Sequence, residues 1–122
     1  MKVLITGAAG FIGLKLSNSL VKKGIFIVAL DNLSAQVHGP FPSDQYEPLK
    51  HKNSVEFFRS DIRNTDVLDR ALKDCEALIH LAAETGTGQS MSLISHYYDV
   101  NLNATSKLFE LIVTKHVKYV GF

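Results

Sequence analysis

Cysteine, net charge and long apolar runs are all scarce in this chain of 122 residues. Its one cysteine, Cys75, excludes an internal disulfide framework and fits a reducing compartment, so we expect a cytoplasmic protein. Thirteen Lys and Arg balance twelve Asp and Glu to a net charge of +1, which leaves no electrostatic footprint for nucleic acid or an anionic membrane. No stretch approaches the ~20 apolar residues of a membrane span. We therefore expect no nucleic-acid partner and no membrane segment.

Metal-ligand patterns are scarce as well. The five histidines are scattered, and none pairs with cysteines or with another histidine four positions away, so we expect no structural metal. The composition, 46% hydrophobic and 20% charged, is that of an ordinary globular protein. A chain of this length can bury roughly two-thirds of its unfolded surface, which predicts one domain over residues 1–122.

Five short apolar runs are present, and helical periodicity separates several of them. The expected strands are residues 3–5, 25–30, 55–58, 77–82 and 117–120. Such nearly continuous apolar runs are typical of parallel strands covered on both faces. One helix is expected over residues 10–23, and a second begins after an N-cap at Asn64 or Thr65. A third is expected over residues 92–115, with a break near its start. Residues 32–53 show no clear period and are expected to form a loop. The alternation predicts a Rossmann-type, doubly wound α/β fold with strand order 3-2-1-4-5.

The first expected helix begins on a glycine-rich turn, Thr6-Gly-Ala-Ala-Gly-Phe-Ile-Gly13. A pyrophosphate can approach a helix N-terminus when the turn before it carries no side chains. Gly7 would make the turn, Gly10 would admit the phosphates and Gly13 would let the helix pack on the sheet, with Phe11 and Ile12 in its first turn. We expect Phe11 or Ile12, Leu16, and Ser19 or Leu20 on one face of this helix. A glycine turn without function is the alternative, and the strand-to-helix context favours phosphate binding.

Acidic residues follow the second and third strands. Asp31, with Asn32 beside it, lies where a carboxylate accepts hydrogen bonds from the hydroxyls of an adenine ribose, and it would repel a 2′-phosphate. This predicts NAD rather than NADP, although Asp-Asn is also good turn chemistry. Asp61 and Ile62 could flank the adenine, unless Asp61 only starts the next helix.

The segment after the fourth strand combines small and neutral polar residues. Leu81, Ala82 and Ala83 would let the backbone approach the cofactor, while Thr85 and Thr87 suit a sugar substrate. A polar surface loop is the alternative.

Two polar residues fall in otherwise apolar surroundings. Asn101 lies on the inward stripe that Tyr97, Ala104, Leu108 and Leu111 define on the third helix. Its amide either bridges backbone groups between helix and strand or contacts the cofactor. His80, at a strand end, is expected to be a core histidine with its hydrogen bonds satisfied.

Taken together, these motifs resemble the NAD-dependent epimerase/dehydratase family of extended short-chain dehydrogenases, in order and spacing and over essentially the whole chain. The matching segments are Thr6 to Gly13, Asp31-Asn-Leu33, Asp61-Ile-Arg63, His80-Leu-Ala-Ala83 and Asp99-Val-Asn101. Asp31 to Ser34 and Ala83 to Ser90 are most similar to nucleotide-rhamnose 4-epimerases. The resemblance implies a nucleotide-sugar epimerase that binds NAD, oxidises the sugar transiently at C4 and forms a homodimer. It equally admits 4,6-dehydratases and reductases, which share this first half.

The family's catalysis needs a tyrosine followed four residues later by a lysine, in a helix after the fifth strand. Tyr46 and Lys50 have that spacing, but Pro48 lies between them in the expected loop, so we interpret the match as coincidence. No catalytic residue is assigned. We expect the chain to be the N-terminal, NAD-binding part of a longer enzyme, truncated before the substrate domain and inactive alone. The alternative is a non-catalytic dinucleotide sensor.

Overall fold

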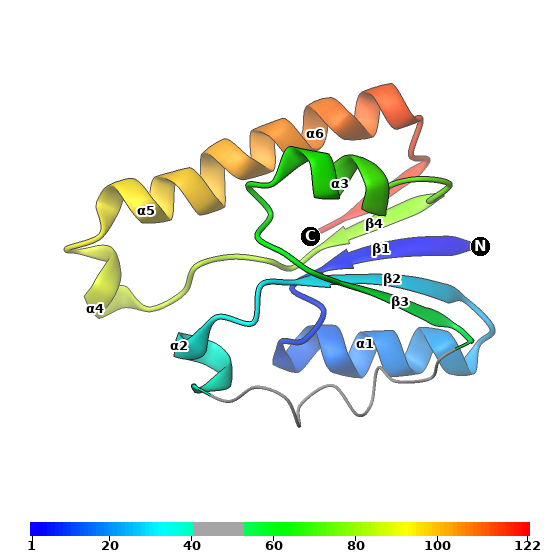
Figure 1. Ribbon diagram of the computed structural model, residues 1–122, viewed down its shortest axis with the longest axis horizontal. Helices are drawn as coiled ribbons and strands as arrows, with labels where there is room; N and C mark the ends of the chain where they lie inside the picture. Colours follow the sequence, from blue (N-terminus) through cyan, green and yellow to red (C-terminus); the bar gives the residue numbers. More distant parts are fainter. Residues whose placement is uncertain (41–52) are drawn as a thin grey trace.

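A five-stranded parallel sheet forms the centre of the computed structural model, which describes residues 1–40 and 53–122. The strands are β1 (Lys2–Thr6), β2 (Phe26–Asp31), β3 (Val55–Arg59), β4 (Ala77–His80) and β5 (Tyr119–Gly121). They lie in the order β3-β2-β1-β4-β5 (Figure 1), which confirms the Rossmann-type order predicted from the sequence.

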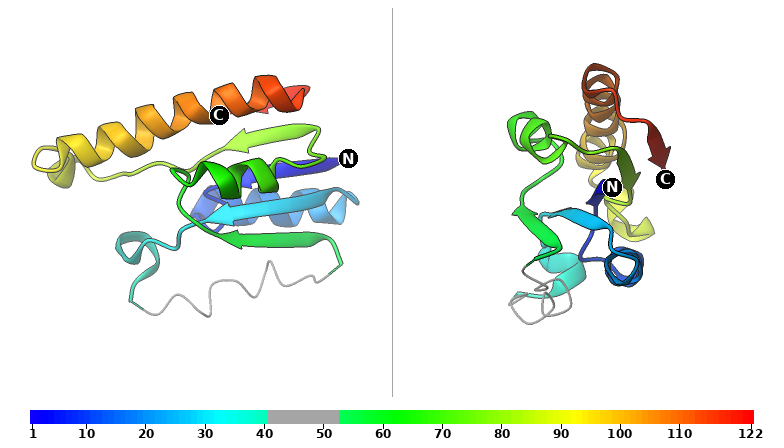
Figure 2. Two further views of the ribbon diagram at one scale, coloured as in Figure 1. Left: turned by 45° about the horizontal axis from the view of Figure 1, so that its top comes forward. Right: turned by 90° about the vertical axis from the view of Figure 1, so that its right-hand side faces the viewer.

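Helices cover both faces of this sheet. They are α1 (Phe11–Lys22), α2 (Ala35–His38), α3 (Thr65–Ala71), α4 (Thr87–Ser90), α5 (Ile94–Tyr98), the π-helical turn η2 (Asp99–Asn103) and α6 (Ala104–Lys115). Figure 2 shows α1 on one face and α3 with α6 on the other, so the sheet is doubly wound. No helix within residues 1–40 and 53–122 is long and apolar enough to cross a membrane.

The central strands are apolar at successive positions because they are covered on both sides. On β1, Val3 and Ile5 pack toward α1, whereas Leu4 packs toward α3 and α6. The next strand repeats this alternation with Ile27 and Ala29 on the α1 side and Val28 and Leu30 on the other. All seven side chains are buried, as expected when successive residues point to opposite faces of a covered sheet.

The inward face of α1 differs from the prediction. Phe11 and Ile12 are 76% and 63% exposed, so their expected packing on the sheet is wrong. The first turn of α1 projects past the ends of the strands, and burial begins only at Gly13, continues through Ser17 and includes the partly buried Leu20. The glycine turn, rather than the hydrophobic period, therefore sets where α1 meets the sheet.

Part of the expected loop after β2 is ordered as the one-turn helix α2. Leu33 is buried and has a positive φ of 60°, which reverses the direction of the chain. Ser34 follows as the N-cap of α2. A single turn is too short to produce a periodic sequence signal. Residues 41–52, which include Tyr46 and Lys50, lie outside the described residues.

The third expected helix is continuous through α5, η2 and α6, without the break foreseen near its start. A π-helical turn holds an extra residue and shifts which side chains face inward. The buried residues are Val100, Ala104, Leu108 and Ile112. Ala104 and Leu108 were predicted correctly, but Asn101 is exposed, and its place on a buried stripe is wrong.

Candidate functional site

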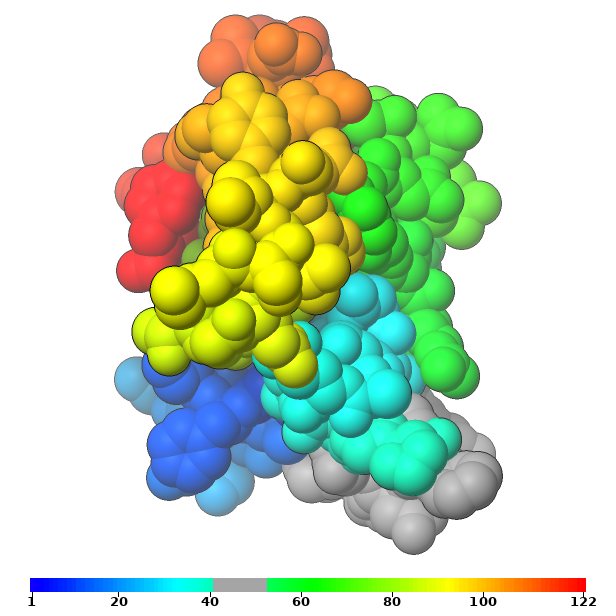
Figure 3. All heavy atoms as spheres, turned by 90° about the vertical axis from the view of Figure 1, so that its left-hand side faces the viewer, coloured from blue at the N-terminus to red at the C-terminus, as the bar shows by residue number. Residues whose placement is uncertain are grey.

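A cavity of about 190 Å³ opens at the carboxyl edge of the sheet. It is lined by the glycine turn, the ends of β2, β3 and β4, helix α2 and one residue of η2. Figure 3 faces this edge, where the cyan residues that follow β2 meet the yellow residues that follow β4. Ligands of open α/β sheets bind outside the carboxyl ends of the strands, so the cavity lies where the fold class places its sites.

Most of the residues proposed from the sequence meet in this cavity. Those in its lining are Gly7, Gly10, Asp31, Asn32, Asp61, Ile62, Leu81, Ala82, Ala83 and Thr85. Phe11, Ile12 and Gly13 form the first turn of α1, directly after Gly10, and like Thr87 and Asn101 they are not in the lining. The first N–H groups of a helix have no carbonyl partner within the helix, so the amides of that turn are available to an anion.

The glycine turn leaves no room for a side chain at Gly7 or at Gly13. A Cβ on Gly7 would lie 2.7 Å from the backbone nitrogen of Ala82, and φ there is 68°. A Cβ on Gly13 would lie 2.3 Å from the carbonyl oxygen of Gly7. The turn is closed by the Gly10 N–H, which donates to the Gly7 carbonyl at 3.1 Å. Bare backbone therefore borders the cavity at the start of α1, as a phosphate cradle requires.

Asp31 ends β2 with its carboxylate on the cavity and only 7% of the residue exposed. Its Oδ2 accepts the Ala9 N–H at 3.0 Å, and its Oδ1 accepts the Leu33 N–H at 2.9 Å. Nε2 of His38 lies 3.7 Å from Oδ1. A carboxylate has about four acceptor positions, so Asp31 can still accept a ligand hydroxyl while holding both backbone groups.

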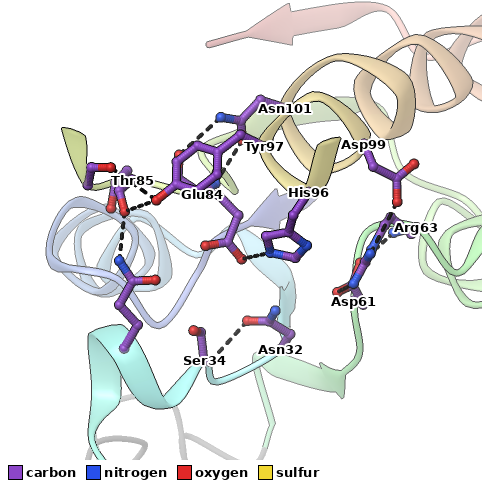
Figure 4. A network of polar contacts seen from close by, with 12 residues as sticks. Asn32, Ser34, Asp61, Arg63, Glu84, Thr85, His96, Tyr97, Asp99 and Asn101 are labelled. Atoms are coloured by element: carbon purple, nitrogen blue, oxygen red, sulfur yellow. Dashed lines mark hydrogen bonds and ion pairs between the residues drawn. The ribbon is translucent and has the colours of Figure 1, made fainter. Parts of the chain in front are cut away.

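Asp61 and Arg63 connect the end of β3 to Asp99, the first residue of η2. Nε and an NH2 group of Arg63 each donate to a different oxygen of Asp61 at 2.9 Å, and another NH2 group donates to Asp99 at 3.1 Å. Arg63 is the main reason that the pKa of Asp61 lies below its usual value. The pKa of Asp99 is also lowered, first by the Asn103 amide and then by Arg63. Asp61 therefore faces the cavity as a carboxylate held by a bidentate arginine (Figure 4).

His80 is a core residue, as expected. Its Nδ1 lies 2.6 Å from Oγ1 of Thr6, and its Nε2 lies 3.0 Å from Oγ1 of Thr105. Burial lowers its pKa, so the neutral imidazole is favoured. The Thr6 hydroxyl also accepts the N–H groups of Leu81 and Ala82, and thereby positions the backbone that lines the cavity after β4.

The segment after β4 is held by side chains from three elements (Figure 4). The Asn101 amide donates to the Glu84 carbonyl at 3.0 Å and accepts the Glu84 N–H at 2.8 Å. Of the two roles proposed for Asn101, the structure shows the one in which its amide bridges backbone groups. The Thr85 carbonyl accepts from Gln36 Nε2 at 2.7 Å and from the Tyr97 hydroxyl at 2.9 Å. Helix α2 and the segment after β4 therefore meet across the cavity mouth.

Several lining residues were missed by the sequence reasoning. They are Leu30, Ser34, Val37, His38, Ser60, Glu84 and Val100. His38 is the most informative, because it is only 7% exposed although it lies within the stretch, residues 32–53, that was interpreted as a surface loop. The only local signal was Gly39, whose positive φ of 73° ends α2 directly after His38.

The sequence matches the model of the NAD dependent epimerase/dehydratase family over residues 3–122. The chain belongs to this family. Among its members, a dTDP-L-rhamnose 4-epimerase of Burkholderia thailandensis is 38% identical over 117 residues, which are 94% of this chain and 31% of that protein. A UDP-glucose 4-epimerase of Klebsiella pneumoniae is 36% identical over 120 residues, which are 97% of this chain and 84% of that protein.

Solved structures of epimerase/dehydratase enzymes have the same fold. A dTDP-glucose 4,6-dehydratase from Streptomyces venezuelae with NAD bound superposes with a TM-score of 0.85 at 27% identity, over 98% of this chain and 38% of that one. A UDP-glucose 4-epimerase from Thermus thermophilus in complex with NAD gives 0.81 at 28% identity, over 98% and 36%. The chain thus spans about a third of the length of the rhamnose epimerase and of both solved enzymes.

Proposed function

We propose that this chain is the NAD-binding part of a nucleotide-sugar epimerase. The observation that carries the proposal is that Gly7 and Gly10 of the turn before α1 and the buried carboxylate of Asp31 border one cavity at the carboxyl edge of the sheet. Membership of the family supports the same cofactor. When bound, NAD would supply the transient oxidation at sugar C4 on which epimerisation depends.

The residues of the cavity fit the parts of a dinucleotide. Gly7 and Gly10, with the amides of Phe11, Ile12 and Gly13, would hold the pyrophosphate at the N-terminus of α1. Asp31 and Asn32 would bind the adenine ribose, and Asp61 and Ile62 would flank the adenine. Leu81, Ala82 and Ala83 would offer backbone to the remainder of the cofactor. Asn101 would act through Glu84, because its amide is engaged by that residue's backbone.

Asp31 would also select NAD over NADP. Its carboxylate is buried, and a 2′-phosphate placed against it would bring like charges together in a poorly solvated site. Isothermal titration calorimetry with NAD and NADP on the parent chain and on Asp31→Ala tests both claims. We expect the parent to bind NAD at least tenfold more tightly than NADP, and Asp31→Ala to lose most of that preference. Equal or tighter binding of NADP by the parent would remove this role from Asp31.

We propose that the 122 residues alone do not catalyse epimerisation. The one tyrosine with a lysine four positions later is Tyr46, and Pro48 lies between it and Lys50. The chain also spans about a third of the rhamnose epimerase that it resembles. Thr85 borders the cavity, and Thr87 begins α4 two residues later, so both would contact the sugar of a nucleotide-sugar substrate. A chromatographic assay of UDP-glucose and dTDP-rhamnose turnover with added NAD tests this, and product formed by the chain alone would overturn it.

The similarity to a 4,6-dehydratase supports a second candidate, an enzyme that eliminates water after oxidation. Sequencing the source gene beyond the codon for Phe122 and assaying its complete product separates the two. An inverted sugar supports the epimerase, and a 4-keto-6-deoxy sugar supports the dehydratase. A stop codon directly after Phe122 would favour a dinucleotide-sensing module.

We further propose that the complete enzyme is a cytoplasmic homodimer. Large apolar side chains are exposed along one long helix at Ile94, Tyr98, Leu102, Phe109 and Val113, which supports a protein contact there. The buried free thiol of Cys75 fits a reducing compartment. Light scattering coupled to size-exclusion chromatography of the complete product would give twice the monomer mass if this is right.

A further inference from the structure

The mouth of the cavity is bridged by a hydrogen bond between two segments that are far apart in the chain. Gln36 of α2 donates through Nε2 to the carbonyl oxygen of Thr85 at 2.7 Å, although 49 positions separate the two residues. The cavity is lined on both sides of this bridge, by Ser34 and Val37 next to Gln36 and by Glu84 next to Thr85. The bridge therefore lies across a path between the solvent and the cavity.

Gly86 has a backbone conformation that lets the bridge form. Its φ of 120° is one that residues with a side chain rarely adopt. A Cβ at this position would lie 3.1 Å from Nε2 of Gln36 and 3.3 Å from the hydroxyl oxygen of Tyr97. Both of these groups donate to the Thr85 carbonyl. Glycine at position 86 therefore leaves the space in which two donors reach one acceptor.

The two sides of the bridge are anchored unequally. On the β4 side, the backbone of Glu84 makes two hydrogen bonds to Asn101, and its carboxylate lies 3.2 Å from Nε2 of His96 (Figure 4). Tyr97 donates to the next carbonyl along the chain, so this segment is fixed to α5 and η2. On the other side, Gln36 is exposed on the four-residue helix α2. An exposed hydrogen bond from so short an element breaks at small cost, because water replaces the lost partner.

We infer that Gln36 is a latch that controls the exchange of the cofactor. While its hydrogen bond to Thr85 is made, the bridge obstructs the opening, and NAD enters or leaves after the bond breaks and α2 separates from the segment after β4. This inference rests on the proposed NAD-binding function and goes beyond it, because it concerns the rates of binding. A bond that is made both with and without the cofactor raises the barrier in both directions and cancels from the affinity.

A latch and a direct contact with the cofactor have different kinetic signatures. Removing a direct contact speeds dissociation and leaves association nearly unchanged, so the affinity falls. Removing a latch increases the population of the open form, which raises the association and dissociation rate constants by the same factor. The net contribution of one exposed hydrogen bond corresponds to a factor of about five.

The test is stopped-flow fluorescence of the chain with NADH, which carries the same dinucleotide and has a fluorescent reduced nicotinamide. Association is measured at rising NADH concentration, and dissociation by displacement with excess NAD. Gln36→Met keeps the length of the side chain and removes the donor, and Gln36→Ala shortens the side chain as well. Gln89→Met is the matched control, because Gln89 is exposed on α4 and its side chain makes no hydrogen bond to the described residues. Circular dichroism and thermal unfolding check that each variant is folded.

We expect both rate constants to rise about fivefold in Gln36→Met and in Gln36→Ala, with a change of less than about twofold in Kd. Gln89→Met should keep the rates of the parent. A rise in the dissociation rate constant alone, or unchanged rates in both Gln36 variants, would overturn the latch and leave the proposed function standing. A parent that binds neither NADH nor NAD would overturn the proposed function, and the latch with it.

Discussion

The carboxylate of Asp31 accepts the backbone N–H of Ala9 at 3.0 Å and so ties the end of β2 to the glycine turn after β1. The same carboxylate holds the Leu33 N–H at 2.9 Å, so one side chain supports two of the backbone segments around the cavity. An acid at this position therefore shapes the site as well as facing its ligand.

Replacing Asp31 by asparagine should destabilise the chain even without ligand. An amide offers one acceptor oxygen, so one of the two backbone N–H groups would face the new NH2 group. We expect the free energy of unfolding, measured by urea denaturation, to fall by about 1–3 kcal/mol. Asp69→Asn is the matched control, because its exposed ion pair with Lys115 should change the value by less than about 1 kcal/mol. Equal losses in the two variants would show that the bonds to Ala9 and Leu33 contribute little.

Gly13→Ala should destabilise the chain through a steric contact between α1 and the turn. The added Cβ would lie 2.3 Å from the Gly7 carbonyl oxygen, and that backbone atom cannot move without disturbing the turn. We expect a loss of about 1–3 kcal/mol in the free energy of unfolding, with weaker NAD binding. Gly88→Ala meets no atom within 4 Å and should leave stability unchanged or slightly higher. An unaltered melting temperature in Gly13→Ala would argue against close packing at this position.

Arg63 should make stability depend on pH in the acidic range. It holds the pKa of Asp61 below its usual value and contributes to the lowered pKa of Asp99. A carboxyl whose pKa is lower in the folded state stabilises the fold above its unfolded pKa, and that contribution is lost as the pH falls through the folded pKa.

Removing the guanidinium should therefore cost stability near neutral pH and little in strong acid. We expect the difference in unfolding free energy between the parent and Arg63→Met to be larger at about pH 6 than at about pH 3. Arg59→Met, which removes an exposed arginine at the end of β3, should give a difference that varies less with pH. A difference for Arg63→Met that stays constant over this range would contradict the assignment.

Ser17→Ala should not destabilise the chain. The Ser17 hydroxyl lies on the buried side of α1 and meets no hydrogen-bond partner among the described residues. Removing a buried, unpaired hydroxyl relieves its desolvation cost, so we expect the free energy of unfolding to stay the same or rise by up to about 1 kcal/mol. Ser19→Ala, on the exposed side of α1, measures the part that comes from helix propensity alone. A loss above 1 kcal/mol in Ser17→Ala would reveal a partner for this hydroxyl.

Sequence alone was sufficient for the sheet, its order and most of the cavity. Apolar runs such as residues 25–30 are covered on both faces, so their pattern reports burial directly. The glycines of the turn could be identified because a tight turn and close packing of the helix on the sheet each require glycine at a fixed spacing. Asp31 could be identified because a ribose-binding acid follows those glycines at a fixed distance. Asn64 could be assigned as an N-cap for the same reason, and its side chain does accept the Val67 N–H.

Tertiary structure alone decided the features that join segments distant in the chain. Phe11 and Ile12 are exposed because α1 begins beyond the strand ends, and no local period reports where a helix lies relative to a sheet edge. Asn101 reaches the Glu84 backbone because a π-helical turn alters the register of its helix. His38 reaches Asp31 through the left-handed Leu33 and one helical turn, a reversal too short to leave a repeat in the sequence. Local patterns report which residues are buried, whereas the meeting of side chains across the cavity depends on how the elements pack.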